Sequence, residues 1–488
     1  MKALLFVVDN PPNMRIKAGA FGISQPLGAG YIASVLRENG HDVRILDNSI
    51  RHLGPEALRR IVQDFKPDVA GFTTFTFSAK GCFEAARLMK EADPRLITVF
   101  GGPHATYLCE ETLADPAVDV VVRGEGEMTM RELVAALAAG RSLEGVKGLL
   151  FKDAAGRIIR TADRELILDL DTLPLPAYDL MDMDKYYASV NRRFTDKKFG
   201  AIITTRGCPF QCTFCSHKMF GKKLRTRSPE NVVNEIEHLI SRYGIGELIF
   251  LDDTFTMDRK RALALCDLIV RRGLDIAWTC NTRADDASEE LYKAMRRAGC
   301  RGLHLGAESA SQEMLDSMKK GITLEQITNA VALAKKHIGH VVCGFILGMP
   351  GDTVERARAT IAFAKKLSPD YVTFNIATPV PGSEIYEDAV AAGLLDTTQA
   401  PWEDFLELFS PSPPVLTLSS IPAEDLVRLA KRAFREFYFR PPYVWSRLAK
   451  MRSAKDAFEH LKGLAAIVNY ELCASARKAA AAASGRRP

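Results

Sequence analysis

The chain alternates short apolar runs with amphipathic segments in two separate stretches, and this alternation restricts its fold more than any other feature. In residues 1–140 each apolar run has the length of a strand, and the segment after it has helical periodicity. Strands are predicted at 3–8, 43–46, 69–72, 97–100 and 118–122. Helices are predicted at 27–36, 55–64, 80–92, 107–114 and 127–139. Repeated βα units of this length predict a Rossmann-like, doubly wound parallel sheet of the α/β class.

The second stretch, residues 199–377, repeats the pattern six times. Strands are predicted at 200–205, 247–251, 275–280, 302–306, 342–347 and 371–376. Helices are predicted at 229–243, 258–272, 288–298, 311–319, 324–336 and 353–366. Six such units predict a partial (β/α)6 barrel, whose active groups belong at the carboxyl ends of the strands.

Between and after these stretches the pattern changes. Residues 147–162 are typical of a β-hairpin, and 171–179, with two prolines, predict a linker. We therefore expect five parts: a first sheet domain, a hairpin with linker, the partial barrel, a helical C-terminal region, and a disordered low-complexity tail. Their predicted ranges are 1–145, 146–195, 196–380, 381–473 and 474–488.

Three cysteines follow the first predicted barrel strand. Cys208, Cys212 and Cys215 have the spacing C-x3-C-x2-C in a segment whose glycine, proline and glutamine predict a loop. Three thiolates can hold three corners of a cubane iron–sulfur cluster and leave the fourth iron open. Two alternatives remain: a zinc site, for which His217 is the only nearby fourth ligand, and unreactive thiols.

The cysteine segment resembles the signature of radical S-adenosylmethionine (SAM) enzymes, including the aromatic Phe214 before the last cysteine. The resemblance implies that Cys208, Cys212 and Cys215 ligate a [4Fe-4S] cluster whose open iron binds SAM. Motifs after the second, third, fourth and fifth barrel strands match this family in the same order. Two aspartates follow the second strand, and one of them is expected to cap the next helix. The resemblance assigns SAM contacts to Phe214, Asp252, Asp253, Arg283, Glu308, Ser309, Ile346 and Gly348.

Loops rich in glycine and hydroxyl groups follow three strands of the first stretch. They are 72–78, 101–106 and 123–127. Glycine allows a bulky ligand to approach the backbone, and hydroxyls supply hydrogen bonds. None of the loops has the spacing G-x-G-x-x-G, which argues against a nicotinamide cofactor.

With the cysteine motif downstream, this half resembles the cobalamin-binding domain of radical SAM enzymes that carry B12. The resemblance assigns cobalamin contacts to Leu27, Gly28, Thr74, Ser78, Gly101, Gly102, His104, Gly124 and Glu125. The loop Asp-x-His-x-x-Gly, whose histidine binds cobalt in many B12 proteins, occurs nowhere among the nine histidines. The expectation is therefore cobalamin without a protein imidazole on its metal.

Composition excludes several other classes of protein. Of the 488 residues 47% are apolar, and the net charge of +5 is too small and too evenly spread for a nucleic-acid-binding protein. Ten cysteines in a long chain without small-domain disulfide spacing predict a reducing, cytoplasmic location. The apolar run at residues 1–8 is too short for a signal peptide, and no run has membrane-spanning length.

Residues 431–447 interleave six aromatic with five basic side chains. Core packing is the simpler interpretation, and a basic aromatic surface that meets a membrane or lipid-like substrate is the alternative.

Roughly residues 1–450 resemble the group that contains the anaerobic Mg-protoporphyrin ester cyclases and the hopanoid C-methylases. The resemblance implies reductive cleavage of SAM to a 5′-deoxyadenosyl radical and transfer of a methyl group from methylcobalamin to an unactivated carbon. It also implies a small-molecule substrate of lipid or tetrapyrrole type, a flavodoxin or ferredoxin-type reductant, and a monomer. One alternative uses the same cofactors for oxidation, cyclisation or rearrangement. Another is a non-catalytic, zinc-stabilised cobalamin or tetrapyrrole carrier.

Overall fold

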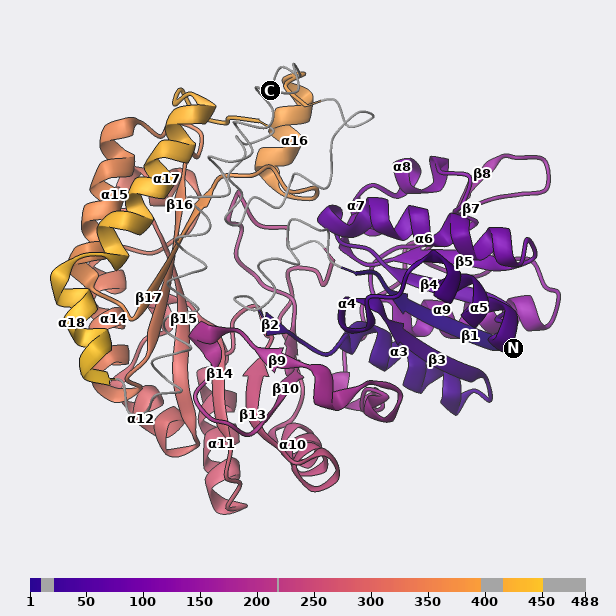
Figure 1. The fold of residues 1–488 in the computed structure, drawn as a ribbon, viewed down its shortest axis with the longest axis horizontal. Coiled ribbons are helices and arrows are strands. Elements are labelled where there is room, and N and C mark those ends of the chain that lie inside the picture. Colours follow the sequence, from indigo (N-terminus) through magenta and orange to yellow (C-terminus); the bar gives the residue numbers. More distant parts are fainter. Residues whose placement is uncertain (10–21, 217–218, 396–415, 451–488) are drawn as a thin grey trace.

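The computed structural model describes residues 1–9, 22–216, 219–395 and 416–450. It places two α/β units side by side, with the N-terminal unit on the right and the C-terminal unit on the left of Figure 1. His217 and the predicted tail, 474–488, lie outside the described residues. Residues 396–415 and 451–473 of the predicted C-terminal region also lie outside them.

The N-terminal unit contains the predicted parallel sheet. Its first five strands have the order β3-β1-β4-β5-β6. They are β1 (Lys2–Val7), β3 (Asp42–Asp47), β4 (Val69–Thr73), β5 (Ile97–Gly101) and β6 (Val120–Val122). The predicted hairpin, β7 (Leu149–Lys152) and β8 (Ile158–Arg160), continues this sheet, because β7 pairs antiparallel with β6.

Helices cover both faces of the first sheet, as a doubly wound fold requires. α3 (Leu27–Glu38) and α9 (Gly126–Ala138) pack on one face, and α5 (Pro55–Phe65) and α6 (Ala79–Ala92) pack on the other. The helix predicted at 107–114 is instead two helices, α7 (Pro103–Tyr107) and α8 (Cys109–Ala114). The first begins at Pro103 because proline suits the first helical position after the φ of +94° at Gly102.

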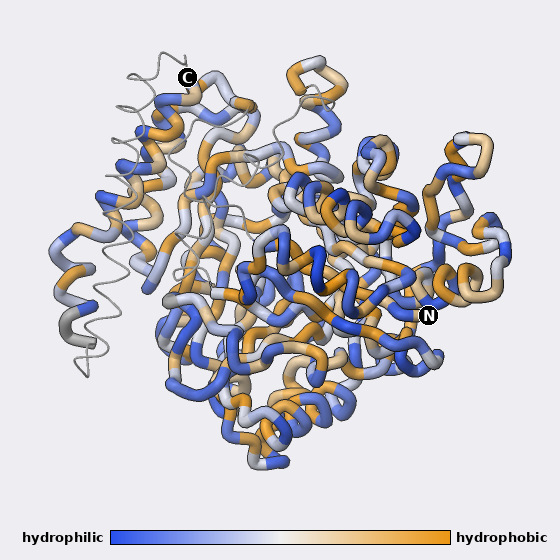
Figure 2. Tube along the Cα trace, turned by 45° about the vertical axis from the view of Figure 1, so that its right-hand side comes forward, coloured by the Kyte–Doolittle hydropathy of each residue, from blue (hydrophilic) through white to orange (hydrophobic). Residues whose placement is uncertain are grey.

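The C-terminal unit is the predicted partial barrel. Its six parallel strands have the order β10-β13-β14-β15-β16-β17. They are β10 (Lys198–Ile202), β13 (Ile245–Phe250), β14 (Ala277–Thr282), β15 (Cys300–Glu308), β16 (Val341–Leu347) and β17 (Tyr371–Ile376). The helices are α10 (Pro229–Tyr243), α11 (Arg259–Arg271), α12 (Glu289–Arg297), α13 (Gln312–Ser317), α14 (Leu324–His337) and α15 (Val354–Leu367). These helices alternate hydrophilic and hydrophobic residues (Figure 2), as helices with one face on a sheet must.

The segment between the two units packs against both. The Ala177 N–H donates to the Gly30 carbonyl of α3 at 3.1 Å, and the fully buried Tyr178 donates to Glu235 of α10. One continuous apolar core includes residues of both sheets. This packing holds the carboxyl ends of the two sheets in a set relation to each other.

The C-terminal helices α16 (Glu384–Ala391), α17 (Ala423–Tyr438) and α18 (Pro441–Lys450) follow the barrel. α17 covers β17, where the Tyr438 hydroxyl accepts from the Val372 N–H at 3.0 Å and donates to the Val372 carbonyl at 2.8 Å. Core packing is confirmed for four aromatics of 431–447, namely Phe434, Phe437, Tyr438 and Tyr443. Phe439 and Trp445 stay 47% and 71% exposed. No helix in the described ranges is long and apolar enough to cross a bilayer.

Candidate functional site

The three cysteines lie in a loop at the carboxyl end of β10. Short strands β11 (Thr205–Arg206) and β12 (Arg225–Thr226) pair antiparallel and close the neck of this loop, which we call the cysteine loop (207–224). Gly207 begins it at a φ of +86°, and a Cβ there would lie 2.4 Å from the Lys223 carbonyl oxygen. Only glycine fits this position, so the sequence Arg-Gly-Cys is needed for the loop to form.

Backbone hydrogen bonds hold the cysteine loop against three other parts of the chain. The Thr213 N–H donates to the Met318 carbonyl at 3.0 Å, and the Ile385 N–H donates to the Thr213 carbonyl at 3.1 Å. From the N-terminal unit, the Tyr107 hydroxyl accepts from the Met219 N–H at 2.7 Å. The loop is therefore held between the barrel, α16 and the first sheet.

The three thiols are close enough to interact electrostatically. Burial raises the pKa of Cys215 to about 12, and the neighbouring Cys212, Asp253 and Cys208 add to that shift. Burial also raises the pKa of Cys208, with Asp253 and Cys212 contributing. Three thiols this close together suit a bound cation, which replaces their protons. Within the described residues no three His, Cys, Asp or Glu groups are close enough to hold a single metal ion. Three thiols in one loop are the donor set that can hold a cubane cluster with one iron left open.

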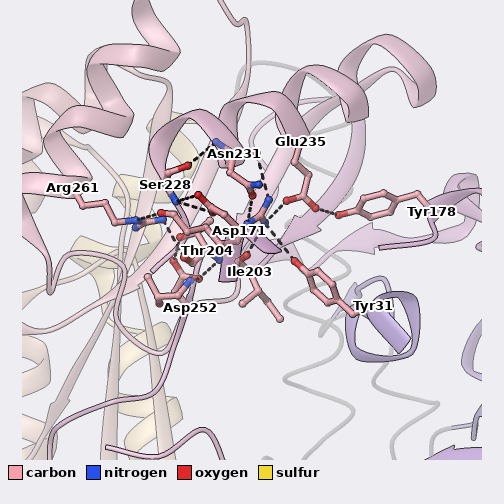
Figure 3. Close-up of polar contacts among 12 residues, drawn as sticks. Tyr31, Asp171, Tyr178, Ile203, Thr204, Ser228, Asn231, Glu235, Asp252 and Arg261 are labelled. Atoms are coloured by element: carbon pink, nitrogen blue, oxygen red, sulfur yellow. Dashed lines mark hydrogen bonds and ion pairs between the residues drawn. The ribbon is translucent and has the colours of Figure 1, made fainter. Parts of the chain in front are cut away.

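Asp252, the first aspartate after β13, is fully buried beneath the start of the cysteine loop (Figure 3). It accepts from the Thr204 N–H at 2.6 Å and the Thr205 N–H at 2.9 Å. Arg261 donates to the Thr204 carbonyl at 3.1 Å on the same turn. Asp252 therefore holds the backbone that leads into Cys208.

The expected helix cap among the two aspartates is wrong. α11 is capped by Asp258, whose side chain accepts from the Arg261 N–H. The helix begins at Arg259, close to its predicted start, and both aspartates lie too early in the turn to cap it. Asp253 stays exposed and within electrostatic reach of Cys208 and Cys215.

Arg283 and Phe210 connect the cysteine loop to the end of β14. The Arg283 guanidinium lies 3.4 Å from the centre of the Phe210 ring, and it donates to the Lys320 carbonyl at 2.7 Å. It also forms an ion pair with Asp285 at 3.0 Å. Such cation–π contacts orient the ring and stabilise the loop.

The end of β15 carries a buried ion pair. Glu308 has a φ of +60°, unusual for a residue other than glycine, and its Oε1 accepts from Lys320 Nζ at 2.7 Å. Lys320 also lies 5.7 Å from the Phe214 ring centre. A Cβ on Gly306 would come within 2.3 Å of Glu308 Oε1, so this glycine makes room for the pair.

Sequence reasoning missed Lys320, because it follows an ordinary exposed lysine in a short helix-to-loop segment and matches no motif. The remaining predicted SAM residues lie on the same side of the barrel. Ser309 accepts from the Ser311 N–H at 3.1 Å, and Gly348, at a φ of +82°, donates to Asp352 at 2.8 Å. Ile346 is half-buried on β16.

The three loops that follow β4, β5 and β6 contact one another. Thr74 donates its hydroxyl to the Gly101 carbonyl at 2.7 Å, and the Gly124 N–H donates to Thr106 at 3.0 Å. A Cβ on Gly102 would lie 2.9 Å from the Thr74 carbonyl oxygen. These contacts join the loops after β4, β5 and β6 into one surface at the carboxyl edge of the sheet.

Other residues assigned to cobalamin differ in their surroundings. Ser78 closes its own turn with Phe75, Leu27 packs in the core, and burial lowers the pKa of His104 to about 4. Nothing lies within 4 Å of a Cβ built on Gly28 or on Gly124. These open glycines leave the space that a large flat ligand needs at this edge.

Glu125 belongs to a buried ion-pair network between the units, which we call the interface network (Glu125, Glu127, Arg206 and Arg225). Glu125 accepts from Arg206 at 2.8 Å and from Arg225 at 2.8 Å, and Arg206 also donates to Glu127 at 2.6 Å. The Ile167 N–H donates to Glu125 at 2.9 Å. The Glu125 carboxylate thus joins the β6 loop to the neck of the cysteine loop.

A second set of buried contacts, drawn in Figure 3, also joins the two units. Arg227 forms an ion pair with Glu235 and donates to the Ile203 carbonyl at 3.0 Å and to the Tyr31 hydroxyl of α3 at 3.4 Å. The interface network therefore joins the loop after β6 to the neck of the cysteine loop, and the second set joins α3 to the barrel beside it.

Comparisons with known proteins agree with this arrangement. Residues 202–364 match the Radical SAM superfamily, and residues 16–134 match the B12 binding domain. The chain is 40% identical to an uncharacterized methyltransferase, PH0819, of Pyrococcus horikoshii, over 94% of this chain and 95% of that protein. It is 32% identical to an anaerobic magnesium-protoporphyrin IX monomethyl ester cyclase of Rubrivivax gelatinosus, over 74% of this chain and 66% of that protein.

Among solved structures the chain resembles the radical S-adenosylmethionine methyltransferase TsrM of Kitasatospora setae, solved with cobalamin and a [4Fe-4S] cluster. The TM-score is 0.66 at 21% identity, covering 82% of this chain and 76% of that one. This likeness supports the arrangement of the two sheets.

Proposed function

We propose, from the premise that the chain belongs to the radical SAM superfamily and carries a B12-binding domain, that it is a cobalamin-dependent radical SAM enzyme which methylates an unactivated carbon of a small molecule. The observation that carries this proposal is the direct connection of the B12-domain loop to the neck of the cysteine loop through Glu125 and Arg206. When bound, the cluster with SAM supplies a carbon-centred radical, and methylated cobalamin supplies the methyl group.

The chain's own residues hold and shield these groups. Cys208, Cys212 and Cys215 would ligate the cluster, and Asp253, Arg283 and the inner ends of β15 and β16 would hold SAM. Glu308 would bind the ribose, since its second oxygen has no hydrogen-bond partner among the described residues. The loops after β4, β5 and β6 would hold cobalamin at the facing edge.

The test of this proposal is the mass of the products. When the anaerobically reconstituted protein is given SAM, cobalamin and a reductant, it should form 5′-deoxyadenosine and S-adenosylhomocysteine. The product should be heavier than its substrate by the mass of one methylene unit. A second candidate is radical oxidation or cyclisation without methyl transfer, and the observation behind it is the likeness to the cyclase. It predicts 5′-deoxyadenosine with loss of hydrogen or no change in mass. A carrier without catalysis would form no 5′-deoxyadenosine.

The reductant, the cellular location, the oligomeric state and the type of substrate belong to the same proposal. Cluster reduction calls for a flavodoxin or ferredoxin-type donor, and the cytosol keeps the thiols reduced. We propose a monomer, because the buried network lies within one chain. Four of the six aromatics of 431–447 belong to the core, so a soluble substrate is favoured over a membrane-bound one.

Glu308→Ala should weaken SAM binding by one to two orders of magnitude. A hydrogen bond to a charged group contributes about 1.5–3 kcal/mol, and about 1.4 kcal/mol corresponds to tenfold in affinity. Equilibrium dialysis with labelled SAM measures the change, and Glu313→Ala, an exposed acid on α13, is the control. Unchanged affinity with an intact cluster would show that Glu308 serves only to neutralise Lys320.

Cobalamin bound to the first sheet should have no histidine nitrogen on cobalt. His104 is buried within α7, and the histidine-containing cobalt loop is absent from the sequence. Electron paramagnetic resonance of the Co(II) form should therefore lack nitrogen superhyperfine splitting. A nitrogen signal that disappears in His104→Ala would contradict this expectation.

A further inference from the structure

The inner face of the half barrel is partly accessible along three adjacent strands. β15, β16 and β17 alternate fully buried residues, which pack toward the helices, with residues that keep accessible surface. The accessible positions of β15 include His304 and Gly306, and Gly306 lies beside Gly344 of β16 in register. Two neighbouring glycines remove side-chain volume from this face. Glu308 and Lys320 occupy the space beside Gly306, whereas His304, nearer the amino end of β15, keeps accessible surface.

A short segment before β10 closes the amino end of this face. The Phe194 N–H donates to Glu247 at the start of β13 at 2.5 Å, and the Asn191 carbonyl lies 2.9 Å from His340 Nε2. A Cβ on Gly302 of β15 would lie 2.9 Å from the Phe194 ring, so Phe194 lies directly against that strand. Arg192, two residues earlier, extends its side chain to the next inner position, His304.

Arg192 is a half-buried cation that forms no ion pair with a carboxylate in the described part of the chain. Its Nη2 donates to His304 Nδ1 at 3.1 Å and to Asn281 Oδ1 at 3.3 Å, both neutral acceptors. Burial lowers the pKa of Arg192 to about 10, which leaves it charged at neutral pH. Among the described groups, none accepts from its Nε or Nη1.

Three buried arginines near the cysteine loop differ in this respect. Arg206, Arg225 and Arg227 each form an ion pair with glutamate. Arg192 instead contacts only neutral acceptors, and because its side chain keeps some accessible surface it can bind a group that comes from outside the chain. Burial, followed by the charge of Arg192, lowers the pKa of His304 well below its usual value. Because arginine can only donate, His304 accepts through Nδ1 and carries its proton on Nε2, which has no partner among the described residues.

We propose that Arg192 binds an anionic group of the substrate, a carboxylate or a phosphate-type group, on the inner face of the half barrel beside Asn281 and His304. This inference rests on the proposed function, since it names the chemical class of that enzyme's substrate. His304 and Glu308 are four residues apart on β15, which corresponds to about 13 Å along a strand. An anion on Arg192 thus leaves room for several bonds of substrate between it and the carboxyl end, where the cysteine loop lies.

The experiment measures binding of small probes to the full-length reconstituted protein by calorimetry at constant ionic strength. The probes are propanoate, inorganic phosphate and the neutral propanamide, and the variants are Arg192→Gln, Arg192→Lys and the control Arg193→Gln, an exposed neighbour paired with Asp196. Wild type and Arg193→Gln should bind propanoate or phosphate, and whichever binds identifies the anion class. Arg192→Gln should bind the anion about tenfold or more weakly than wild type, and Arg192→Lys should lose less affinity. Propanamide should bind neither to wild type nor to any variant.

Equal anion binding in wild type and Arg192→Gln, or none in wild type, would overturn the inference. If Arg192→Gln does not fold, unchanged binding in Arg192→Lys overturns it, because lysine cannot reproduce the guanidinium's paired donors. SAM affinity should be the same in Arg192→Gln and wild type, and a loss would assign the arginine to SAM instead. Wild type that binds the anion but forms no 5′-deoxyadenosine would refute the proposed function and leave the anion site standing.

Discussion

Replacing Cys208, Cys212 and Cys215 together by alanine should abolish both the iron–sulfur cluster and 5′-deoxyadenosine formation. Wild type reconstituted without oxygen should contain roughly four irons per chain. The variant should contain almost none, because no other three thiols share a loop. Iron and sulfide analysis, together with electron paramagnetic resonance of the reduced protein with and without SAM, measures the difference.

Cys109→Ala is the matched control, since that thiol lies near Glu110 and Arg160 of the N-terminal unit. It should keep its iron and its SAM-dependent signal. The triple variant should still fold, because its loop is held by Gly207 and backbone hydrogen bonds rather than by the thiols. SAM cleavage that persists in the triple variant would refute the proposed function. Zinc in place of iron would favour the carrier.

Arg206→Met should destabilise the protein more than most single substitutions, because it leaves Glu127 buried without its partner. Removing one member of a buried ion pair costs about 3–5 kcal/mol, which lowers the melting temperature on the order of 5–15 °C. Glu125 keeps its ion pair with Arg225, so Glu127 is the carboxylate that loses its ion-pair partner. Thermal unfolding by circular dichroism gives the magnitude.

The double variant Arg206→Met/Glu127→Gln should recover part of that stability, since both members of the pair lose their charge. Arg59→Gln, which removes an exposed ion pair with Glu91, should change the melting temperature little. If Arg206→Met and Arg59→Gln behaved alike, the interface network would not hold the two units together. Arg206→Met should also change the reduced cluster's spectrum, because Arg206 directly precedes Gly207 and Cys208.

Local patterns in the sequence determined the elements and the chemistry of the cysteine loop. Apolar runs and helical stripes gave strands and helices close to those observed, because parallel strands buried on both faces require continuous apolar segments. The spacing of Cys208, Cys212 and Cys215 is likewise local. Gly102 and Gly207 are needed at positive φ, and such glycines are recognisable in the sequence.

Only the tertiary structure decided which polar residues meet. Glu125 lies in a glycine loop typical of ligand binding, yet its partners Arg206 and Arg225 come from 81 and 100 residues away. Asp252 and Asp253 are adjacent in sequence, and burial separates their roles. Lys320 and Arg192 match no motif, because a charged side chain inside the barrel becomes informative only when its neighbours are seen. Long-range ion pairs depend on the packing of whole units, which no local pattern encodes.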